Sequence, residues 1–367
     1  MNLFSGSIIQ ERVKLFFTQC ISNDRLAHAY LFYGNEGCGK TAFAFELAKV
    51  LNCTSEDDKP CNECPSCIKI NNRQHPDIQF IFPVSKQTKP ETISDFLKVH
   101  SKNPYLIFDI EGHKNIPIEK IRELKNEAKY APFEATKRFF IIDGAEYFSR
   151  ESANSFLKLL EEPPDNILII LITNNIHAIL DTIRSRCQPV LFPTFSEEQL
   201  IEIIRMYNPE APNVMNSIKM AQGNLKKVFE LLNSDSDELR KLAYHFLRAV
   251  AAKNISEYSE IIENISQKRD KNYISEFLDL LILWYRDAIH ILGLENSEDI
   301  INLDLKDSIE KFARHYENKN FENVIEMIEN AATDIKRNAH PALTLTDLAI
   351  RMQEELTASR IGTKEAV

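Results

Sequence analysis

The residues most able to do chemistry in this 367-residue chain form the loop of residues 34–41, GNEGCGKT. Its spacing is G-x-x-x-x-G-K-[ST], in which backbone N–H groups and the lysine surround nucleotide phosphates and the last hydroxyl binds Mg²⁺. Glycines at these positions let the N–H groups turn inward. The candidate ligands are ATP and Mg²⁺, and whether ATP is hydrolysed is a separate question. The residues expected to hold them are Gly34, Gly37, Gly39, Lys40 and Thr41.

Four cysteines follow this loop with the spacing C-x7-C-x2-C-x2-C, at Cys53, Cys61, Cys64 and Cys67. Four thiolates complete a tetrahedral structural zinc site, which leaves no position open for water. We therefore expect Zn²⁺ to stabilise the fold here rather than to catalyse a reaction. A redox CxxC pair and an iron–sulfur cluster are the alternatives. Zinc is favoured because three of the cysteines lie close together on a loop and not at a strand-to-helix redox turn.

The elements around the phosphate loop fit its expected role. Residues 29–33 form a short apolar run that predicts a buried strand, and residues 42–51 predict a helix. Residues 137–143 predict another buried strand, which ends at Asp143. A carboxylate at the end of such a strand is a Walker B element, the usual partner of Mg²⁺ beside a phosphate loop.

Apolar runs alternate with helical patterns as far as residue 193, which predicts an α/β fold with an open, mainly parallel sheet. After Pro193 the periodicity is helical to the end. We expect a phosphate-loop domain at 1–193 with a zinc module near 53–67. A helical lid at 194–235 and an all-α domain at 236–358 would follow, before a polar tail at 359–367. The polar residues 84–104 predict a surface insertion.

Composition limits the location and the partners of the chain. The formal net charge is −10, which argues against tight DNA binding by the chain alone, because neutralising phosphates requires clustered Lys and Arg. It does not exclude membership of a complex whose other subunits hold DNA. No stretch approaches the roughly 18 apolar residues of a membrane span, and the N-terminus lacks a signal-peptide pattern. The sequence therefore predicts a cytoplasmic protein that makes no membrane contact.

Several of these motifs together resemble the delta prime subunits of the bacterial DNA polymerase III clamp loader, within the AAA+ group. The resemblance covers nearly all of residues 6–235 and is weaker beyond them. Besides the phosphate loop and the four cysteines, its carriers are the following: residues 27–32, AHAYLF; residues 75–77, HPD; residues 153–164, ANSFLKLLEEPP; and residues 185–187, SRC.

The resemblance implies a RecA-like domain with an inserted zinc module, a helical lid, and a helical collar that assembles subunits into a ring. It implies gamma/tau and delta subunits as partners. Through the complex, it also implies contact with the sliding clamp and primer-template DNA during replication. The chain would be a component of the DNA polymerase III holoenzyme, a nucleotidyltransferase complex, although nothing in it resembles the carboxylate chemistry of a polymerase.

The resemblance also implies roles for individual residues. Arg186, within Ser-Arg-Cys, is the implied arginine finger, acting in trans on ATP bound by a neighbour, and Arg184 is a nearby competitor outside the motif. A guanidinium at a γ-phosphate stabilises transition-state charge. Thr173 stands where a polar residue contacts phosphate or water in the family, and Lys226 where motor subunits carry the lid arginine.

Two departures from the sequence pattern of motor subunits predict that this chain hydrolyses ATP weakly. Motor subunits end the Walker B strand with Asp-Glu, whereas this chain has Asp143-Gly144, so the carboxylate that polarises the attacking water is missing. Glu146 lies three residues along, too far to replace it where errors of about 1 Å already cost activity. Lys226 retains the charge of an arginine but loses its bidentate fork.

The sequence thus predicts a non-motor, arginine-donating subunit whose own ATPase activity is weak or absent. The first alternative is an active ATPase motor that resembles gamma/tau, which Gly144 opposes. The second is an unrelated zinc-containing, NTP-dependent factor, which the motifs at residues 153–164 and 185–187 oppose.

Overall fold

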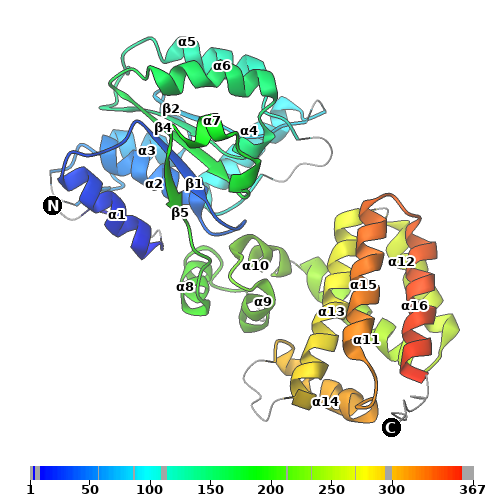
Figure 1. The fold of residues 1–367 in the computed structure, drawn as a ribbon. Helices are drawn as coiled ribbons and strands as arrows, with labels where there is room; N and C mark the ends of the chain where they lie inside the picture. Colours follow the sequence, from blue (N-terminus) through cyan, green and yellow to red (C-terminus); the bar gives the residue numbers. More distant parts are fainter. Residues whose placement is uncertain are drawn as a thin grey trace, which may run out of the picture. The chain divides into compact units, whose positions relative to one another are not determined.

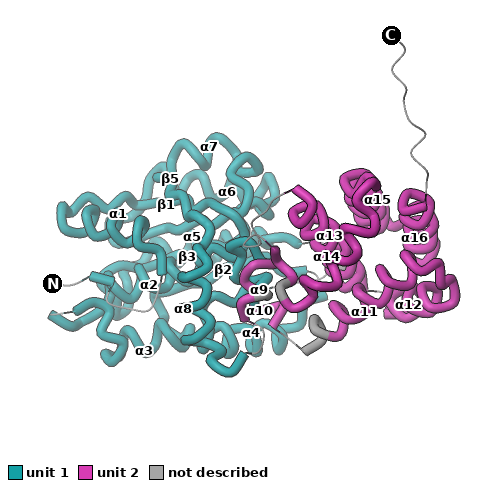
Figure 2. The backbone as a smooth tube through the Cα atoms, turned by 90° about the horizontal axis from the view of Figure 1, so that it is seen from below, with its two compact units in different colours: residues 1–211, 221–228 teal, residues 212–220, 229–367 magenta. Residues whose placement is uncertain are grey.

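A computed structural model of the chain describes residues 3–4, 9–56, 58–85, 87–108, 114–211, 214–232, 234–268, 270–293 and 300–357. The chain divides into two compact units, coloured separately in Figure 2. Unit 1 comprises residues 1–211 and 221–228, and unit 2 comprises residues 212–220 and 229–367.

Unit 1 is built on a five-stranded sheet with the order β2-β3-β4-β1-β5 and every neighbouring pair parallel. The predicted parallel α/β sheet is therefore confirmed. Its strands are β1 (Ala29–Tyr33), β2 (Ile78–Ile81), β3 (Arg138–Ile142), β4 (Ile167–Thr173) and β5 (Gln188–Leu191).

Helices cover both faces of this sheet (Figure 1). The helices that belong wholly to unit 1 are α1 (Glu11–Ser22), α2 (Lys40–Asn52), α3 (Pro65–Asn71), α4 (Pro90–Lys102), α5 (Ile118–Glu127), α6 (Arg150–Glu161), α7 (Asp181–Arg184) and α8 (Glu197–Tyr207). Two 3₁₀ turns, η1 (Ala145–Tyr147) and η2 (Ile176–Ala178), follow β3 and β4.

Consecutive strand residues point to opposite faces, as strand geometry requires. Leu31 belongs to the apolar core that includes Leu124 of α5 and Phe156 of α6. Phe32, the next residue, packs on the other side against Phe17 of α1 and Phe43 of α2. Both sheet faces are therefore apolar, which explains why the strands read as continuous hydrophobic runs.

The parallel register places the functional loops together. Tyr33 of β1 pairs with Thr173 of β4, and Ile142 of β3 pairs with Leu171 of β4. The phosphate loop, Asp143 and Asn174 each follow the carboxyl end of one of these strands. Ligands bind at this edge of open α/β sheets.

Unit 2 is helical throughout its described residues. Its core gathers apolar side chains from five long helices, among them Leu239, Ile265, Phe277, Ile328 and Met352. The helices are α11 (Ser234–Ala251), α12 (Ile255–Gln267), α13 (Lys271–Gly293), α14 (Lys306–His315), α15 (Phe321–Lys336) and α16 (Pro341–Thr357), with one 3₁₀ turn, η4 (Leu303–Leu305). Helices α9 (Val214–Ala221) and α10 (Leu225–Leu231) have residues in both units.

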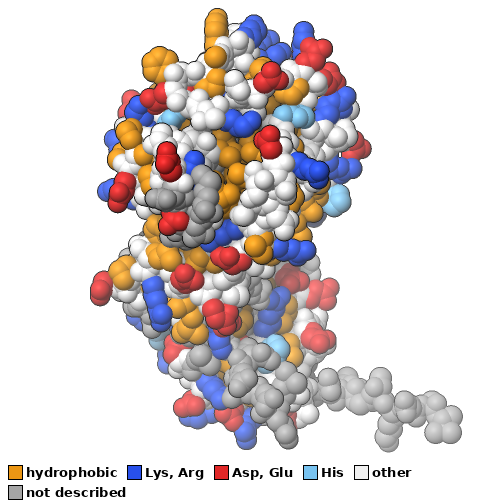
Figure 3. Space-filling model, turned by 90° about the vertical axis from the view of Figure 1, so that its left-hand side faces the viewer, with side chains coloured by type: hydrophobic (Ala, Val, Ile, Leu, Met, Phe, Trp, Pro, Cys, Tyr) orange, Lys and Arg blue, Asp and Glu red, His pale blue; other side chains and the backbone are white. Residues whose placement is uncertain are grey.

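Among the described helices, none combines the length and apolarity needed to cross a bilayer. Acidic and basic side chains are interspersed over the face drawn in Figure 3. The mixed charge of that face gives no reason to expect tight DNA binding by the chain alone.

Candidate functional site

The phosphate loop lies between β1 and α2, as predicted, and Gly39 is the residue immediately before the helix. Gly37 and Gly39 have φ angles of 74° and 80°, in the left-handed region that favours glycine. A Cβ at Gly37 would lie 2.0 Å from Asn224 Oδ1. These two positions therefore need glycine both for the turn and for the close approach of a neighbouring segment.

Lys40 is 5% exposed and its charge is already surrounded by oxygen atoms. Nζ donates to the carbonyl oxygens of Gly34 at 2.9 Å and Asn35 at 2.6 Å. It also donates to Asn174 Oδ1 at 2.8 Å. In this arrangement the side chain of Lys40 binds the loop itself.

Asp143 and Thr41 meet as the Walker pattern predicts, because Thr41 Oγ1 donates to Asp143 Oδ2 at 2.6 Å. Burial raises the pKa of Asp143 against the opposing effects of the Thr41 hydrogen bond and the Lys40 charge. A carboxylate beside a hydroxyl at the end of a buried strand is the arrangement that binds Mg²⁺ in phosphate-loop proteins.

Asn174, the residue after Thr173, is the polar side chain from β4 that reaches Lys40. The hydroxyl of Thr173 instead donates to the carbonyl oxygen of Asn175 and accepts from its N–H. The family pattern indicated Thr173, whereas the side chain that contacts Lys40 is that of Asn174. The sequence does contain an indication for Asn174, because this amide directly follows the carboxyl end of a buried strand, where ligand-binding residues lie.

Gly144 has a φ of 69°, and a Cβ at this position would lie 2.6 Å from Pro83 Cγ and 2.9 Å from Tyr147 Cδ2. The position therefore disfavours any side chain, including the glutamate of motor subunits. Glu146 Oε1 accepts a hydrogen bond from the N–H of Asn174 at 3.2 Å. This carboxylate supports the loop after β4.

Lys226, on α10, lies beside the phosphate loop, where Nζ contacts Glu36 Oε1 at 3.3 Å. The N–H of Leu225 donates to the carbonyl oxygen of Gly37. The structure thus brings the predicted lid lysine to the loop, on its outer side. Sequence reasoning did not foresee Glu36 as its partner.

Arg186 lies in the turn between α7 and β5 and is 36% exposed. Its guanidinium contacts Glu161 Oε1 at 2.8 Å and the carbonyl oxygen of Thr182 at 2.9 Å. Arg184 pairs with Asp181 at 2.6 Å. Both arginines are therefore at the surface of unit 1, and each is held by a carboxylate of its own chain.

The four predicted cysteines form one cluster, in which every Sγ atom lies within 4.8 Å of the others. Cys64 caps α3 and accepts from the N–H of Cys67 at 3.4 Å. Burial raises the pKa of the Cys64 thiol, but N–H donors from Thr54 and Cys67 outweigh it and lower the pKa to about 6. The cluster could bind a metal ion, since the thiolate is the ligand form.

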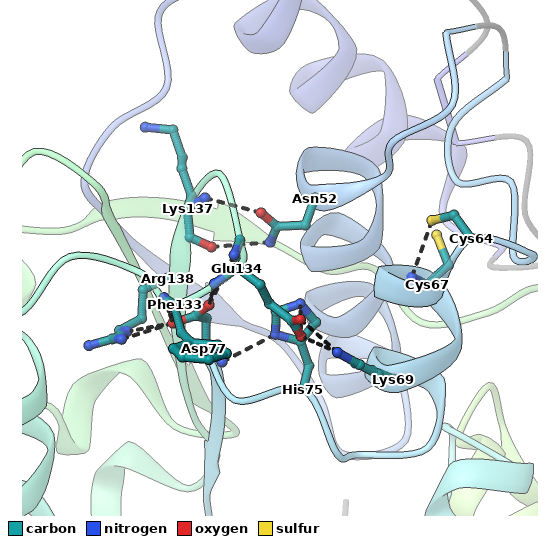
Figure 4. Close-up of polar contacts among 11 residues, drawn as sticks. Asn52, Cys64, Cys67, Lys69, His75, Asp77, Phe133, Glu134, Lys137 and Arg138 are labelled. Atoms are coloured by element: carbon teal, nitrogen blue, oxygen red, sulfur yellow. Dashed lines mark hydrogen bonds and ion pairs between the residues drawn. The ribbon is translucent and has the colours of Figure 1, made fainter.

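A buried polar network joins this module to the sheet (Figure 4). Asp77 is fully buried and accepts from the N–H groups of Phe133, Glu134 and Ala135. Arg138 also donates to it, at 2.8 Å. Burial opposes ionisation, yet these donors lower the pKa of Asp77 to about 2. On the module side, Lys69 of α3 pairs with Glu134 at 2.6 Å.

A small cavity of about 30 Å³ lies against the phosphate loop. It is lined by loop residues 37–41, by Asp143 and Asn174, and by residues 104–107. Such a volume holds one or two water molecules, whereas small-molecule sites usually occupy about 300–1,000 Å³. Residues 104–107 therefore bound the space next to the phosphate loop.

Known proteins resemble this chain over most of its length. A family model described as "DNA polymerase III, delta subunit" matches residues 9–196. A DNA polymerase III subunit delta' of Bacillus subtilis is 28% identical over 352 residues, covering 94% of this chain and 97% of that protein. A DNA polymerase III subunit gamma of Buchnera aphidicola is 25% identical and covers 91% of each.

A solved structure of a DNA polymerase III gamma subunit-related protein from Thermotoga maritima also matches. It covers 93% of this chain and 99% of that one, with 16% identity and a TM-score of 0.44.

Proposed function

The chain belongs to the family described as DNA polymerase III, delta subunit, and we propose that it is the non-motor, delta prime subunit of a clamp loader. It helps to load the sliding clamp onto primed DNA during replication, in a ring with gamma/tau and delta subunits. Two observations together support the proposal. Position 144 is a glycine and lacks the catalytic carboxylate of motor subunits, whereas Arg186 is partly exposed and could contact a neighbouring subunit.

The chemistry assigned to this chain is charge stabilisation in trans. Arg186 leaves Glu161 and places its guanidinium against the γ-phosphate of ATP bound by the adjacent subunit. A planar, permanently charged fork matches the phosphoryl oxygens as their charge spreads in the transition state. The exchange costs little, because the pair with Glu161 is partly exposed and such pairs contribute at most about 1 kcal/mol.

The chain's own ATP turnover is weak or absent under this proposal. Position 144 offers no general base, and the backbone there does not accommodate one. Glu146 is engaged by the N–H of Asn174. Under this proposal neither Asp143, which pairs with Thr41, nor Glu146, which is held through Oε1, removes the proton of a water molecule at the loop.

A gamma/tau-like motor is the alternative function. In its favour are the intact loop and the contact between Thr41 and Asp143, together with a DNA polymerase III subunit tau of Bacillus subtilis at 24% identity over 368 residues. Against it stand Gly144 and the replacement of the lid arginine by Lys226.

We assign zinc to Cys53, Cys61, Cys64 and Cys67. The donor set fits, since an all-sulfur site with Zn–S bonds of about 2.3 Å needs sulfurs roughly 3.8 Å apart, and the four Sγ atoms all lie within 4.8 Å of one another. Backbone N–H groups of Cys61, Cys64 and Cys67 donate to the sulfurs of Cys53, Cys61 and Cys64, respectively. The zinc would fix the loop of residues 53–67 onto α2.

The phosphate site is assigned to Gly34, Gly37, Gly39, Lys40, Thr41 and Asp143, with Thr173 and Lys226 at its margin. These residues would hold ATP and Mg²⁺ only after residues 104–107 move away. The domain assignment is also a proposal. Residues 1–193 form the phosphate-loop domain, residues 194–235 the lid, and residues 236–358 the collar that assembles the ring.

Reconstitution tests the proposed function. The full chain is mixed with gamma/tau and delta subunits, the clamp and primed DNA, and clamp loading is measured with and without this chain. We expect a stable complex and loading that depends on the chain. Failure to enter the complex, or loading at the same rate without the chain, would contradict the proposal.

A further inference from the structure

Residues 104–107, which we call the strap, follow α4 at the end of the segment 84–104 and lie against the phosphate loop. The cavity there is lined on one side by loop residues 37–41 and on the other by all four strap residues. The strap thus occupies space beside the loop that a bound nucleotide would need. The proposed function does not account for this contact.

Tyr105 is the centre of the strap. Its side chain is 4% exposed, and a Cβ at Gly39 would lie 3.1 Å from Tyr105 Cε1, so the ring packs directly on the last glycine of the loop. The ring centroid is 6.1 Å from that of Phe195 and 5.7 Å from that of Tyr207. The Tyr105 hydroxyl accepts a hydrogen bond from the N–H of Ile9 at 3.3 Å.

The strap is fixed at both ends. Before it, the carbonyl oxygen and ring Nδ1 of His100 accept hydrogen bonds from Arg73, and the His100 ring stacks on Phe80. After it, Phe108 packs against Phe82 and Phe96, with centroids 4.9 Å and 4.6 Å away. Anchoring on both sides distinguishes the strap from a loose surface loop.

The polar groups of the loop are satisfied while the strap is in place. Lys40 donates to two loop carbonyls and to Asn174, and Thr41 donates to Asp143. Gln10 Nε2 donates to the carbonyl oxygen of Cys38 at 2.8 Å. The closed arrangement therefore leaves no buried cation that would require an anion for its stability.

We propose that the strap is an intramolecular occupant of the phosphate loop, and that nucleotide binds only to the fraction of molecules in which the strap has left. The apparent dissociation constant is then the intrinsic constant divided by the open fraction. The strap would thus keep nucleotide out of a phosphate loop whose motif is intact. This inference concerns the chain alone and stands whether or not the chain enters a clamp loader.

Calorimetric titration of the full chain with ADP and Mg²⁺ tests the proposal. Tyr105→Ala removes the ring from Gly39, and we expect it to bind ADP at least about tenfold more tightly than the wild type, since the open fraction rises. Tyr105→Phe is the matched control: it retains the ring and should bind ADP as the wild type does. Adding Lys40→Ala to Tyr105→Ala should abolish the gain.

Equal binding by the wild type and Tyr105→Ala, or no binding by either, would overturn the proposal. A second measurement needs no variant. The N–H groups of Tyr105 and Leu106 donate to Asn103, so hydrogen exchange reports whether the strap is closed. Saturating ADP and Mg²⁺ should lower the protection of both amides, and binding with unchanged protection would contradict strap displacement.

Discussion

The phosphate loop and the turn that carries Arg186 differ in the burial and the bonding partners of their charged side chains. Lys40 is buried and bonded to its own loop, and Thr41 is bonded to Asp143. Arg186 is partly exposed and held by one carboxylate, that of Glu161. The charged groups of the phosphate loop are thus bonded to one another within the chain, whereas Arg186 is partly exposed at the surface of unit 1. A recognisable ATPase motif therefore does not by itself locate the chemistry that a chain serves.

The phosphate loop and Arg186 both belong to unit 1, so a variant that unfolds this unit removes both. Effects on stability therefore have to be measured before effects on ATP turnover. Cys67→Ser should produce the largest effect: loss of about one bound zinc per chain and a large loss of stability, since structural zinc binding is coupled to folding. Metal analysis and thermal unfolding measure both. Cys20→Ser, outside the cluster, is the control and should retain the metal. Equal metal content in the two variants would remove the zinc assignment.

Asp77→Asn should destabilise the chain by about 3 kcal/mol, because it leaves Arg138 buried without its carboxylate partner. Lys69→Ala, which breaks the more exposed pair with Glu134, should cost less than about 1 kcal/mol. Denaturant unfolding measures both. We expect neither Asp77→Asn nor Lys69→Ala to change the ATP turnover of the reconstituted complex at temperatures where the variant chain stays folded. That result would show that these contacts stabilise unit 1 without contributing to ATP hydrolysis.

The same carboxylate predicts a pH dependence. The folded pKa of Asp77 is about 2, below the usual value near 3.9. Its contribution to stability is therefore complete above about pH 5 and is lost as the pH falls through about 2. Asp77→Asn should lose this acid-dependent component, and an unchanged pH profile would contradict the assignment.

Gly144→Glu sharpens the difference between the two regions. It restores the sequence of a motor subunit, yet we expect no ATP turnover by the chain alone and a loss of stability of about 1–3 kcal/mol, from backbone strain and contact with Pro83. Gly144→Ala should show similar strain without adding a carboxylate. Appreciable turnover by Gly144→Glu would show that the missing carboxylate alone limits hydrolysis, whereas appreciable turnover by the wild-type chain would favour the motor alternative.

Glu161→Gln should have the smallest effect. It removes the charge that holds Arg186, so stability should change by less than about 1 kcal/mol. ATP turnover of the reconstituted complex should stay the same or rise by up to about fivefold. A marked fall in turnover would mean that Glu161 positions Arg186 rather than restrains it.

The sequence was sufficient for features set by local pattern. The continuous apolar runs predicted the parallel sheet, and the loop at 34–41 and Asp143 were found together as expected. Ser149 and Ser196 each stand directly before a helical pattern in the sequence, and both cap helices in the structure. Each of these features depends on residues that are neighbours in the chain or at the end of the same strand.

Features that depend on long-range packing were missed. Residues 84–104 lie mostly at the surface, as predicted, but the helix α4 within them and the full burial of its His100 were not predicted. Tyr105 and Gln10 reach the loop from distant positions, and nothing local marks them. The absence of a carboxylate at Gly144 was visible in the sequence, whereas its left-handed backbone and the proximity of Pro83 required the structure.

The most direct test of the account is the ATP turnover of a reconstituted complex in which only this chain carries Arg186→Ala. Arginine fingers contribute about 10³-fold or more to phosphoryl transfer. We therefore predict at least a tenfold fall in DNA-stimulated turnover with assembly unchanged, and little change for Arg184→Ala. An unchanged rate for Arg186→Ala, or an equal fall for both variants, would contradict the claim that this chain serves its neighbour's chemistry.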